Sequence, residues 1–468
     1  MRSYKAAAAV MSCATPFIRF RPNERLIVAV FATVFSVLGI LFVHPTSLAH
    51  FGVYLVVWCT FIHLFHRDLT KDFIFAFFIN SAFITAFYLI QTSVYPDSYG
   101  TTSPLSSSWT DDSYFFALAA DDLPPNLVVR DNYFLYEHPY PALVRALTPF
   151  SINHPMDVIF FQSGISAMLA TFTKKYLFQL SANWRLADTA YLFVLVCPFL
   201  MMNGGVLFIR DTFTAALFIY SLSCISAGRI MLAVGALTLQ TAIRPGTAII
   251  LIPAYAIIYW DEIFVLLKSN LAQIVALPVI AVFSIYGLIE FEFLKDKLFA
   301  GITESGGFTL LGRNLITDLM IDPERNVIFS AIQELPYFIK LLFNGAYTFT
   351  YPFLSLKYAF EGDNFDIRAV IMNGIAPVHA LWLNAWFIAG TLTRKPIVRK
   401  QRKIVIAIIV ILLLLGTYSM QTRHKTIIYP LYYFIAVIGF VAAKPAHRTI
   451  GYLCSSALLL PQLLIMLR

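Results

Sequence analysis

The chain has 468 residues, of which 59% are hydrophobic and only 13% are charged. Soluble globular domains contain about 45–50% apolar and about 25% charged residues, so this composition excludes a soluble protein and predicts an all-α polytopic membrane protein. The net charge of +8 would suggest nucleic acid as the partner of a soluble protein. Here the basic residues cluster at the ends of apolar stretches, where membrane orientation and anionic lipids account for them. We expect the lipid bilayer as a partner and no nucleic acid.

Residues 1–25 begin with a basic, alanine-rich stretch that resembles a short signal peptide. The apolar run is too short for one, and Arg19, Arg21 and Arg25 lead directly into the first apolar stretch, so we predict an uncleaved cytoplasmic tail. The five cysteines lie in this tail or in apolar segments, without a Cys-x-x-Cys pair. This pattern favours neither disulfides nor a zinc site.

Apolar stretches of about 20 residues, the length that crosses a bilayer as a helix, recur along the rest of the chain. They predict a single transmembrane domain over residues 26–468 with roughly 11–13 helices. The expected spans are 26–44, 50–65, 73–91, 156–172, 187–208, 211–227, 271–291, 369–391, 404–420, 426–443 and 449–467.

Two further apolar segments are irregular. The segment 230–260 is interrupted by Arg244, Pro245 and Gly246, which predicts two short helices that meet at a bend. The segment 335–356 is rich in aromatic residues and includes Lys, Gly and Pro. That composition predicts a helix that lies along the membrane surface.

The distribution of Lys and Arg predicts which ends of the spans face the cytoplasm. A basic tail directs the first span outward, and the other basic segments then fall on the cytoplasmic side. The loop 92–155, with seven acidic and two basic residues, falls outside, as does the loop 292–368. A basic tail suits a bacterial inner membrane, so we take the outer side to be the periplasm. The segments assigned to the cytoplasm are 66–72, 173–175 with Arg185, Arg229, 393–403 and 444–448.

Polar residues from distant parts of the chain fall at the outward ends of the predicted spans. Independent polar residues would scatter over both membrane sides, so their convergence on one side predicts a single site. Its members are Arg210 and Asp211 in "FIRDTF", Arg244 at the bend, Arg423 and His424 in "QTRHKTIIYP", and Asp111 and Asp112 in the first outer loop.

The arginines indicate the ligand of this site. An arginine at a membrane interface costs several kcal/mol unless it pairs with an anion, and its planar guanidinium suits phosphate. We therefore predict that Arg210, Arg244 and Arg423 bind the phosphate or pyrophosphate of a lipid-linked phosphosugar.

A carboxylate in the first outer loop supplies what glycosyl transfer needs. One of Asp111 and Asp112 would accept the proton of an acceptor hydroxyl or hold a divalent ion, Mg²⁺ or Mn²⁺; a reaction without metal stays open. Asp111, Tyr114 and Leu118 are about one helical turn apart, which predicts a short helix along the surface. His424 is a candidate second base or phosphate contact.

Structural roles compete with these assignments. Asp111 or Asp112 would also serve as a helix cap at "TDDSY", and Asp211 as a neutralising partner of Arg210. The side chain of Arg244 would also fit a snorkelling position, and Arg423 with His424 an interfacial anchor.

The motifs and their order resemble the C-type glycosyltransferase superfamily, polytopic enzymes that use polyprenyl-linked sugars. In that family an acidic motif in the first large outer loop precedes an HP-x-P segment, followed by a Pro-containing span, an Arg-Pro turn and an Arg-rich turn. The corresponding segments here are "DDSYFFALA" with "HPYPALVRALTPF" (138–150), "CPFLMMNGGVLFIRDTFTAALFIY" (197–220), "LTLQTAIRPGTAIILIP" (237–253) and "RHKTIIYPLYYFIAVIGF" (423–440).

The resemblance implies an inverting glycosyltransferase that uses a polyprenyl-(pyro)phosphate-linked donor at the periplasmic face. Its product would be a cell-surface polysaccharide (O-antigen, capsule or exopolysaccharide), with this chain as the repeat-unit polymerase, a lipid-linked or glycan acceptor, and other assembly proteins as partners. Tyr114, His138 and Asp211 would support the site. The chain lacks the soluble carboxyl-terminal domain of oligosaccharyltransferases, and Arg423 with His424 resembles the metal-independent polymerases and O-antigen ligases.

Two other functions compete with the transferase. A lipid-linked sugar flippase or another polytopic transporter would place charges through the depth of a cavity, often between two related halves. The sequence has no internal repeat and few charges within spans, which disfavours transport. A scaffold subunit without activity would tolerate the loss of Arg244 and Asp111.

Overall fold

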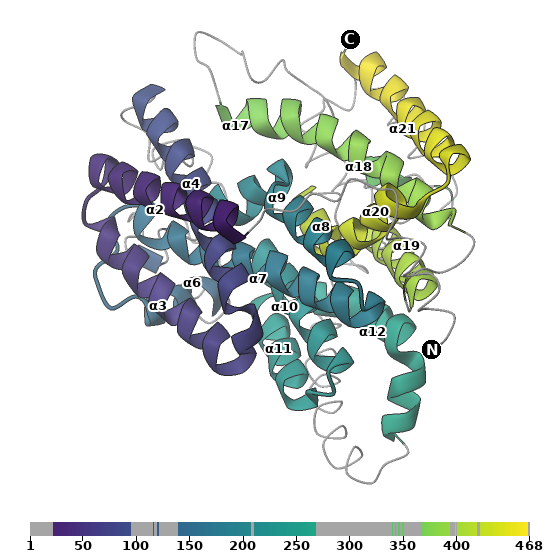
Figure 1. Ribbon diagram of the computed structural model, residues 1–468, viewed down its shortest axis with the longest axis horizontal. Coiled ribbons are helices and arrows are strands. Elements are labelled where there is room, and N and C mark those ends of the chain that lie inside the picture. The colour runs from purple at the N-terminus through teal and green to yellow at the C-terminus, as the bar shows by residue number, and fades with distance from the viewer. Residues whose placement is uncertain are drawn as a thin grey trace, which may run out of the picture.

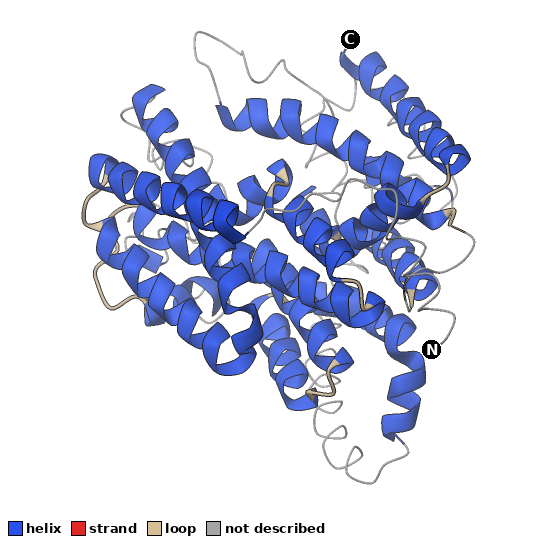
Figure 2. Cartoon of the chain, viewed as in Figure 1, coloured by secondary structure: helices blue, strands red, loops and turns tan. Residues whose placement is uncertain are grey.

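The protein is helical throughout the part that the computed structural model describes, with no strand in that part (Figure 2). The predicted all-α class is therefore confirmed for these residues. The described residues are 22–94, 116, 119–120, 139–206, 210–267, 339, 342, 345–346, 349–350, 367–393, 398, 400–418 and 422–466.

Where they are described, the helices follow most of the predicted apolar stretches. The predicted span 271–291 and nearly all of the predicted outer loop 292–368 lie outside the described residues. Those of the first half are α2 (Pro22–Val43), α3 (Ser47–His66), η1 (Arg67–Leu69), α4 (Thr70–Val94), α6 (Pro139–Leu147), α7 (Met156–Ser181), α8 (Trp184–Leu195), α9 (Pro198–Met201) and η3 (Met202–Val206). Those of the second half are α10 (Asp211–Ser226), α11 (Ile230–Ile243), α12 (Pro245–Leu267), α17 (Ile367–Val370), η6 (Ile371–Ile375), α18 (Ala376–Thr391), α19 (Gln401–Tyr418), η7 (Thr422–Ile427), α20 (Tyr429–Ala442) and α21 (Pro445–Met466).

Several of these helices are long and apolar enough to cross a membrane. Within the described residues, three stretches meet that condition: Asn23–Val43, Ser47–Ile90 and Met156–Ser181. The pair Trp184–Leu195 and Pro198–Val206 adds a fourth when counted as one bent span. At His66 the backbone leaves the helical region (φ −149°, ψ 57°), and α3 then packs against α4, so Ser47–Ile90 consists of two helices rather than one. The total of roughly 11–13 spans stays a prediction.

Proline determines where two helices break. The predicted bend between α11 and α12 is present, because Arg244 is extended (φ −152°, ψ 84°) immediately before Pro245. The predicted single span 187–208 is wrong in one respect: α8 ends at Leu195, and the chain bends by 56° before α9. Pro198 lacks an N–H group and restricts Cys197 to extended backbone (φ −68°, ψ 114°).

Helix α7 forms the centre of the bundle. It is buried over most of its length and packs against α3, α4, α8 and α10. In Figure 1 the purple helices α2, α3 and α4 lie on one side and the green to yellow helices α18, α20 and α21 on the other, with α7, α8 and α10 between them.

Glycines bring the backbones of α18, α20 and α21 into direct contact. A Cβ atom added at Gly439 of α20 would overlap the carbonyl group of Trp386 in α18, and one at Gly451 of α21 would overlap the carbonyl oxygen of Ala385. Small residues at such crossings let helices pack closely where the solvent is lipid. This group therefore depends on glycine at defined positions.

Ion pairs join four helices near one end of the bundle. Asp72 of α4 accepts from Arg25 of α2 (2.7 Å) and from Lys174 of α7 (2.6 Å), and Lys174 also contacts Asp188 of α8 (2.7 Å). Two cations and two carboxylates thus neutralise one another among half-buried side chains, so they hold α2, α4, α7 and α8 together without a net charge.

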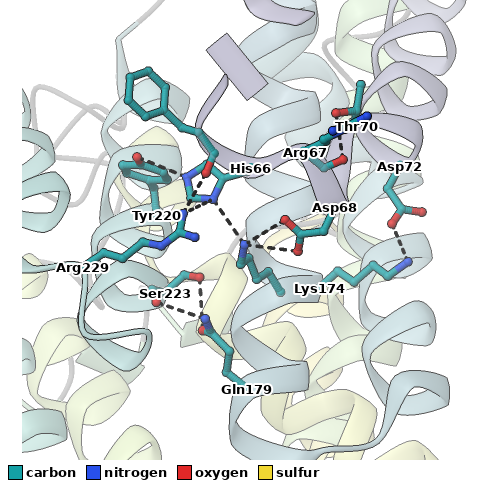
Figure 3. A network of polar contacts seen from close by, with 12 residues as sticks. His66, Arg67, Asp68, Thr70, Asp72, Lys174, Gln179, Tyr220, Ser223 and Arg229 are labelled. Carbon is teal, nitrogen blue, oxygen red and sulfur yellow. Dashed lines mark hydrogen bonds and ion pairs between the residues drawn. The ribbon is translucent and has the colours of Figure 1, made fainter. Parts of the chain in front are cut away.

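A second set of polar contacts lies beside these pairs (Figure 3). The Nδ1 atom of His66 lies 3.2 Å from Lys175 Nζ and 3.4 Å from Arg229 Nη1, while Lys175 also contacts Asp68 (3.3 Å). Arg229 Nη1 donates to the carbonyl of Phe65 (2.7 Å). All these cations come from segments predicted to face the cytoplasm, and they gather together in the structure. The side of the membrane on which this end lies stays a prediction.

Candidate functional site

Three of the predicted site residues meet where α10 begins and α11 gives way to α12. The guanidinium group of Arg244, at the bend, pairs with the carboxylate of Asp211, the first residue of α10. Their side chains are only 9% and 2% exposed. Nη1 of Arg210 donates to the carbonyl of Ile243, the last residue of α11 (3.3 Å). These residues form the arginine junction: Arg210, Asp211 and Arg244.

Helix ends explain why the chain places these residues here. The last carbonyl groups of a helix lack partners within it, and Arg210 satisfies one of them at the end of α11. Asp211 lies in the first turn of α10, where the helix dipole favours a negative charge. Gln240 Nε2 donates to the carbonyl of Thr214 (3.3 Å) and so joins α11 to α10 beside the junction.

The ion pair bears on the alternatives left open by the sequence. The sequence offers Asp211 as a neutralising partner of Arg210, whereas the structure pairs the carboxylate of Asp211 with Arg244, at the break between α11 and α12. A snorkelling arginine would extend its charged head to water, whereas Arg244 is buried against Asp211. Breaking a buried pair leaves an uncompensated charge. The guanidinium group is thus held in a fixed position at the helix break.

The segment that contains Arg423 and His424 lies close to α10. Both residues are part of η7, whose backbone packs against α10 and adjoins α19 and α20. Their side chains lie outside the described part of the structure. The predicted Arg-rich turn therefore packs against α10, the helix that begins at Asp211.

Lys425 is a buried cation that the sequence analysis missed. It is only 2% exposed, and its Nζ donates to the carbonyl of Phe349 (2.6 Å). The Tyr429 and Tyr432 rings lie 5.7 and 5.8 Å from Nζ, where they favour a cation. Burial lowers the pKa of Lys425 to about 7, although Cys197 opposes the shift. The sequence does contain a signal for this buried cation: Lys425 stands directly before the apolar run "TIIYPLYY". A lysine in that position has little room for a solvated ammonium group.

The remaining predicted site residues lie outside the described residues: Asp111, Asp112, Tyr114 and His138. Of the predicted surface helix 335–356, only isolated positions are described. Within the described part, no group of three or more His, Cys, Asp or Glu side chains is arranged to hold a metal ion. A Mg²⁺ or Mn²⁺ site at Asp111 or Asp112 is therefore an expectation from the sequence alone.

Comparison with known proteins yields no relative: no family model, no curated protein and no solved structure matches this chain. The resemblance to C-type glycosyltransferases therefore depends on the short motifs and their order. The fold and the site together describe a helical protein with apolar helices of membrane-spanning length and a buried arginine–aspartate pair at a helix break.

Proposed function

We propose that the protein is a glycosyltransferase of the bacterial inner membrane. It transfers sugar units from a polyprenyl-(pyro)phosphate-linked donor at the periplasmic face and acts as the repeat-unit polymerase of a cell-surface polysaccharide. The observation that supports this proposal best is the arginine junction, where two arginines contact the ends of neighbouring apolar helices.

The junction has the features of a phosphate site. Helices α10 and α12 both begin here, and the N-terminus of a helix favours an anion through its unpaired N–H groups and its dipole. A guanidinium group has five donors, so Arg244 can contact a phosphate while it keeps its bond to Asp211. Because the flanking helices are apolar, the lipid tail of a polyprenyl phosphate can remain in the membrane while its head group reaches the arginines.

Each residue of the site has a role in this proposal. Arg210 and Arg244 bind the donor phosphate, and Arg423 of η7 adds a third positive charge beside α10. Asp211 fixes Arg244 in place before the donor arrives. Asp111 or Asp112 in the outer loop, or His424, accepts the proton of the acceptor hydroxyl as the phosphate leaves.

Polysaccharide length in cells tests the proposal. A strain of the source organism that lacks the gene is complemented with the wild type, Arg244→Ala, Arg210→Ala, Asp111→Asn or Asp112→Asn. We expect each arginine variant to lose long polysaccharide while the lipid-linked unit accumulates. One of the two aspartate variants should do the same if that aspartate is the base. Gels report chain length, and immunoblots of membranes report protein abundance.

Arg185→Ala is the matched arginine control. Arg185 is exposed at the start of α8, with its guanidinium group over the ring of Trp184, 5.4 Å from the centroid. It should retain long polysaccharide. Normal polysaccharide in all four test variants at wild-type abundance would refute the transferase proposal. Accumulation of the lipid-linked unit only on the cytoplasmic side, where an impermeant glycosidase cannot reach it, would favour the flippase.

A further inference from the structure

A buried carboxylate at the start of α7 lies among three histidines. Asp157 has no exposed surface. Its oxygens accept hydrogen bonds from Ser47 Oγ (2.6 Å) and from the backbone N–H groups of Asn153 and His154 (2.9 Å each). A buried carboxylate needs such donors, and three of them fix this one in position.

The contact with Ser47 favours one tautomer of His44. Ser47 has a single hydroxyl proton, which it donates to Asp157, so its oxygen can only accept from His44 Nδ1 (3.0 Å). The same Nδ1 lies 3.6 Å from Asp157 Oδ1, and Thr46 Oγ1 at 3.0 Å can share its hydrogen. With the hydrogen on Nδ1, the lone pair of the imidazole lies on Nε2, on the ring edge away from Asp157. The His44 side chain is 28% exposed, which leaves it accessible to a substrate.

Two further histidines pack against this pair: His154 against His44, and His50 against Asp157. The ring of His154 stacks on that of His44, with centroids 4.5 Å apart. Burial, and next the His44 ring, lower the pKa of His154 to about 4, so this neighbour is neutral near pH 7. His50 is buried, with Nδ1 3.4 Å from Asp157 Oδ1, and neither of its ring nitrogens has a hydrogen-bond partner within the described residues. The site therefore contains a second imidazole close to the same carboxylate.

The histidine cluster and the arginine junction lie at the same end of the bundle. Helices α7 and α10 run in the same direction, because Phe161 packs on Phe213 (6.1 Å between centroids) and Phe172 packs on Tyr220 (4.6 Å). The first residues of both helices, Met156 and Asp211, therefore lie at the same end of the bundle. An acceptor hydroxyl near His44 would lie on the side of the molecule where Arg210 and Arg244 would hold the donor.

We propose that His44 is the general base of the glycosyl transfer, and that Ser47 and Asp157 are positioning residues. This inference rests on the proposed function and assigns the proton to His44 in place of Asp111, Asp112 or His424. The acceptor hydroxyl oxygen forms a bond to the anomeric carbon and gives its proton to His44 Nε2. The bond from that carbon to the phosphate oxygen breaks, and its electron pair leaves with the phosphate. The imidazolium is stabilised through Ser47 by Asp157 and later releases the proton to water.

A transfer assay tests the assignment in full-length protein reconstituted in liposomes with its lipid-linked repeat unit. We expect His44→Gln to lower kcat about 100-fold or more, since general bases contribute on the order of 10²–10⁴. Binding of polyprenyl phosphate should not change. His63→Gln is the control, because His63 is exposed on α3 outside the cluster.

Chemical rescue separates a base from a merely structural histidine. Added imidazole should restore part of the rate of His44→Ala but none of that of Arg244→Ala. An unchanged kcat for His44→Gln, or no rescue of a folded His44→Ala, would overturn the assignment and leave the proposed function intact. If the wild type neither binds polyprenyl phosphate nor transfers sugar, both proposals are overturned.

Discussion

Replacing Arg244 by methionine is expected to lower the free energy of unfolding by about 3–5 kcal/mol, because the carboxylate of Asp211 is then buried without its cation. Asp211→Leu should cost a similar amount, since it leaves the guanidinium group unpaired. The double variant should regain much of the loss, because a well-packed apolar pair avoids the desolvation of both charges. Denaturant titration of purified protein in detergent measures all three.

The exposed pair Lys403–Asp261 provides the control. Its side chains are 32% and 76% exposed, so Lys403→Met should change stability by less than about 1 kcal/mol. If Arg244→Met were equally mild, Arg244 and Asp211 would not form a buried pair. If the double variant were as unstable as the single ones, the contribution of the pair would not be electrostatic.

Among glycine-to-alanine substitutions in the described helices, Gly439→Ala should lower the stability of the protein most. The new Cβ would overlap backbone atoms of Trp386, so α18 and α20 must move apart rather than repack a side chain. Overpacking typically costs about 1–3 kcal/mol, and a collision with backbone belongs at or above the upper end. Melting temperature and membrane abundance are the measurements.

Gly235→Ala is the matched substitution, because nothing lies within 4 Å of a Cβ atom at this position of α11. It should be neutral or stabilising by up to about 1 kcal/mol, since alanine favours a helix over glycine. Equal tolerance of both substitutions would contradict the close contact of α18 and α20.

Sequence patterns predicted the helices and one helix break for physical reasons that are local. Long apolar runs define helices such as α2 and α7, and proline after Arg244 forces extended backbone. Pro198 misled the prediction, because proline inside an apolar run either bends a span or divides it, and packing decides between the two outcomes. The distribution of Lys and Arg along the chain was enough to predict that Lys174, Lys175 and Arg229 lie at the same end of the bundle.

The partners of the polar residues could not be predicted in the same way. Asp211 meets Arg244 only because α10 and α11 pack side by side, and His44 meets Asp157 only because α3 packs on α7. Histidines at the ends of apolar runs have no periodic signal, so His44 and His154 could not be recognised as neighbours. Contacts of this kind depend on the tertiary fold.

The arginine junction is also a structural element, and this complicates the interpretation of simple arginine variants. Arg210 holds the end of α11, and Arg244 neutralises Asp211, so the loss of either side chain affects folding and ligand binding together. The double variant Arg244→Met with Asp211→Leu removes both charges of the buried pair while it retains a packed junction. It therefore separates the two effects.

Lipid binding to this double variant is the most direct test of a phosphate site at the arginine junction. The melting temperatures of the purified wild type and double variant are measured with polyprenyl monophosphate and with polyprenol of the same length. We predict that the phosphate lipid stabilises the wild type more than polyprenol does, and that this preference is clearly smaller in the double variant, which retains Arg210 but lacks Arg244. An equal response of the wild type to both lipids, or an undiminished preference for the phosphate lipid in the double variant, would contradict a phosphate site at Arg244.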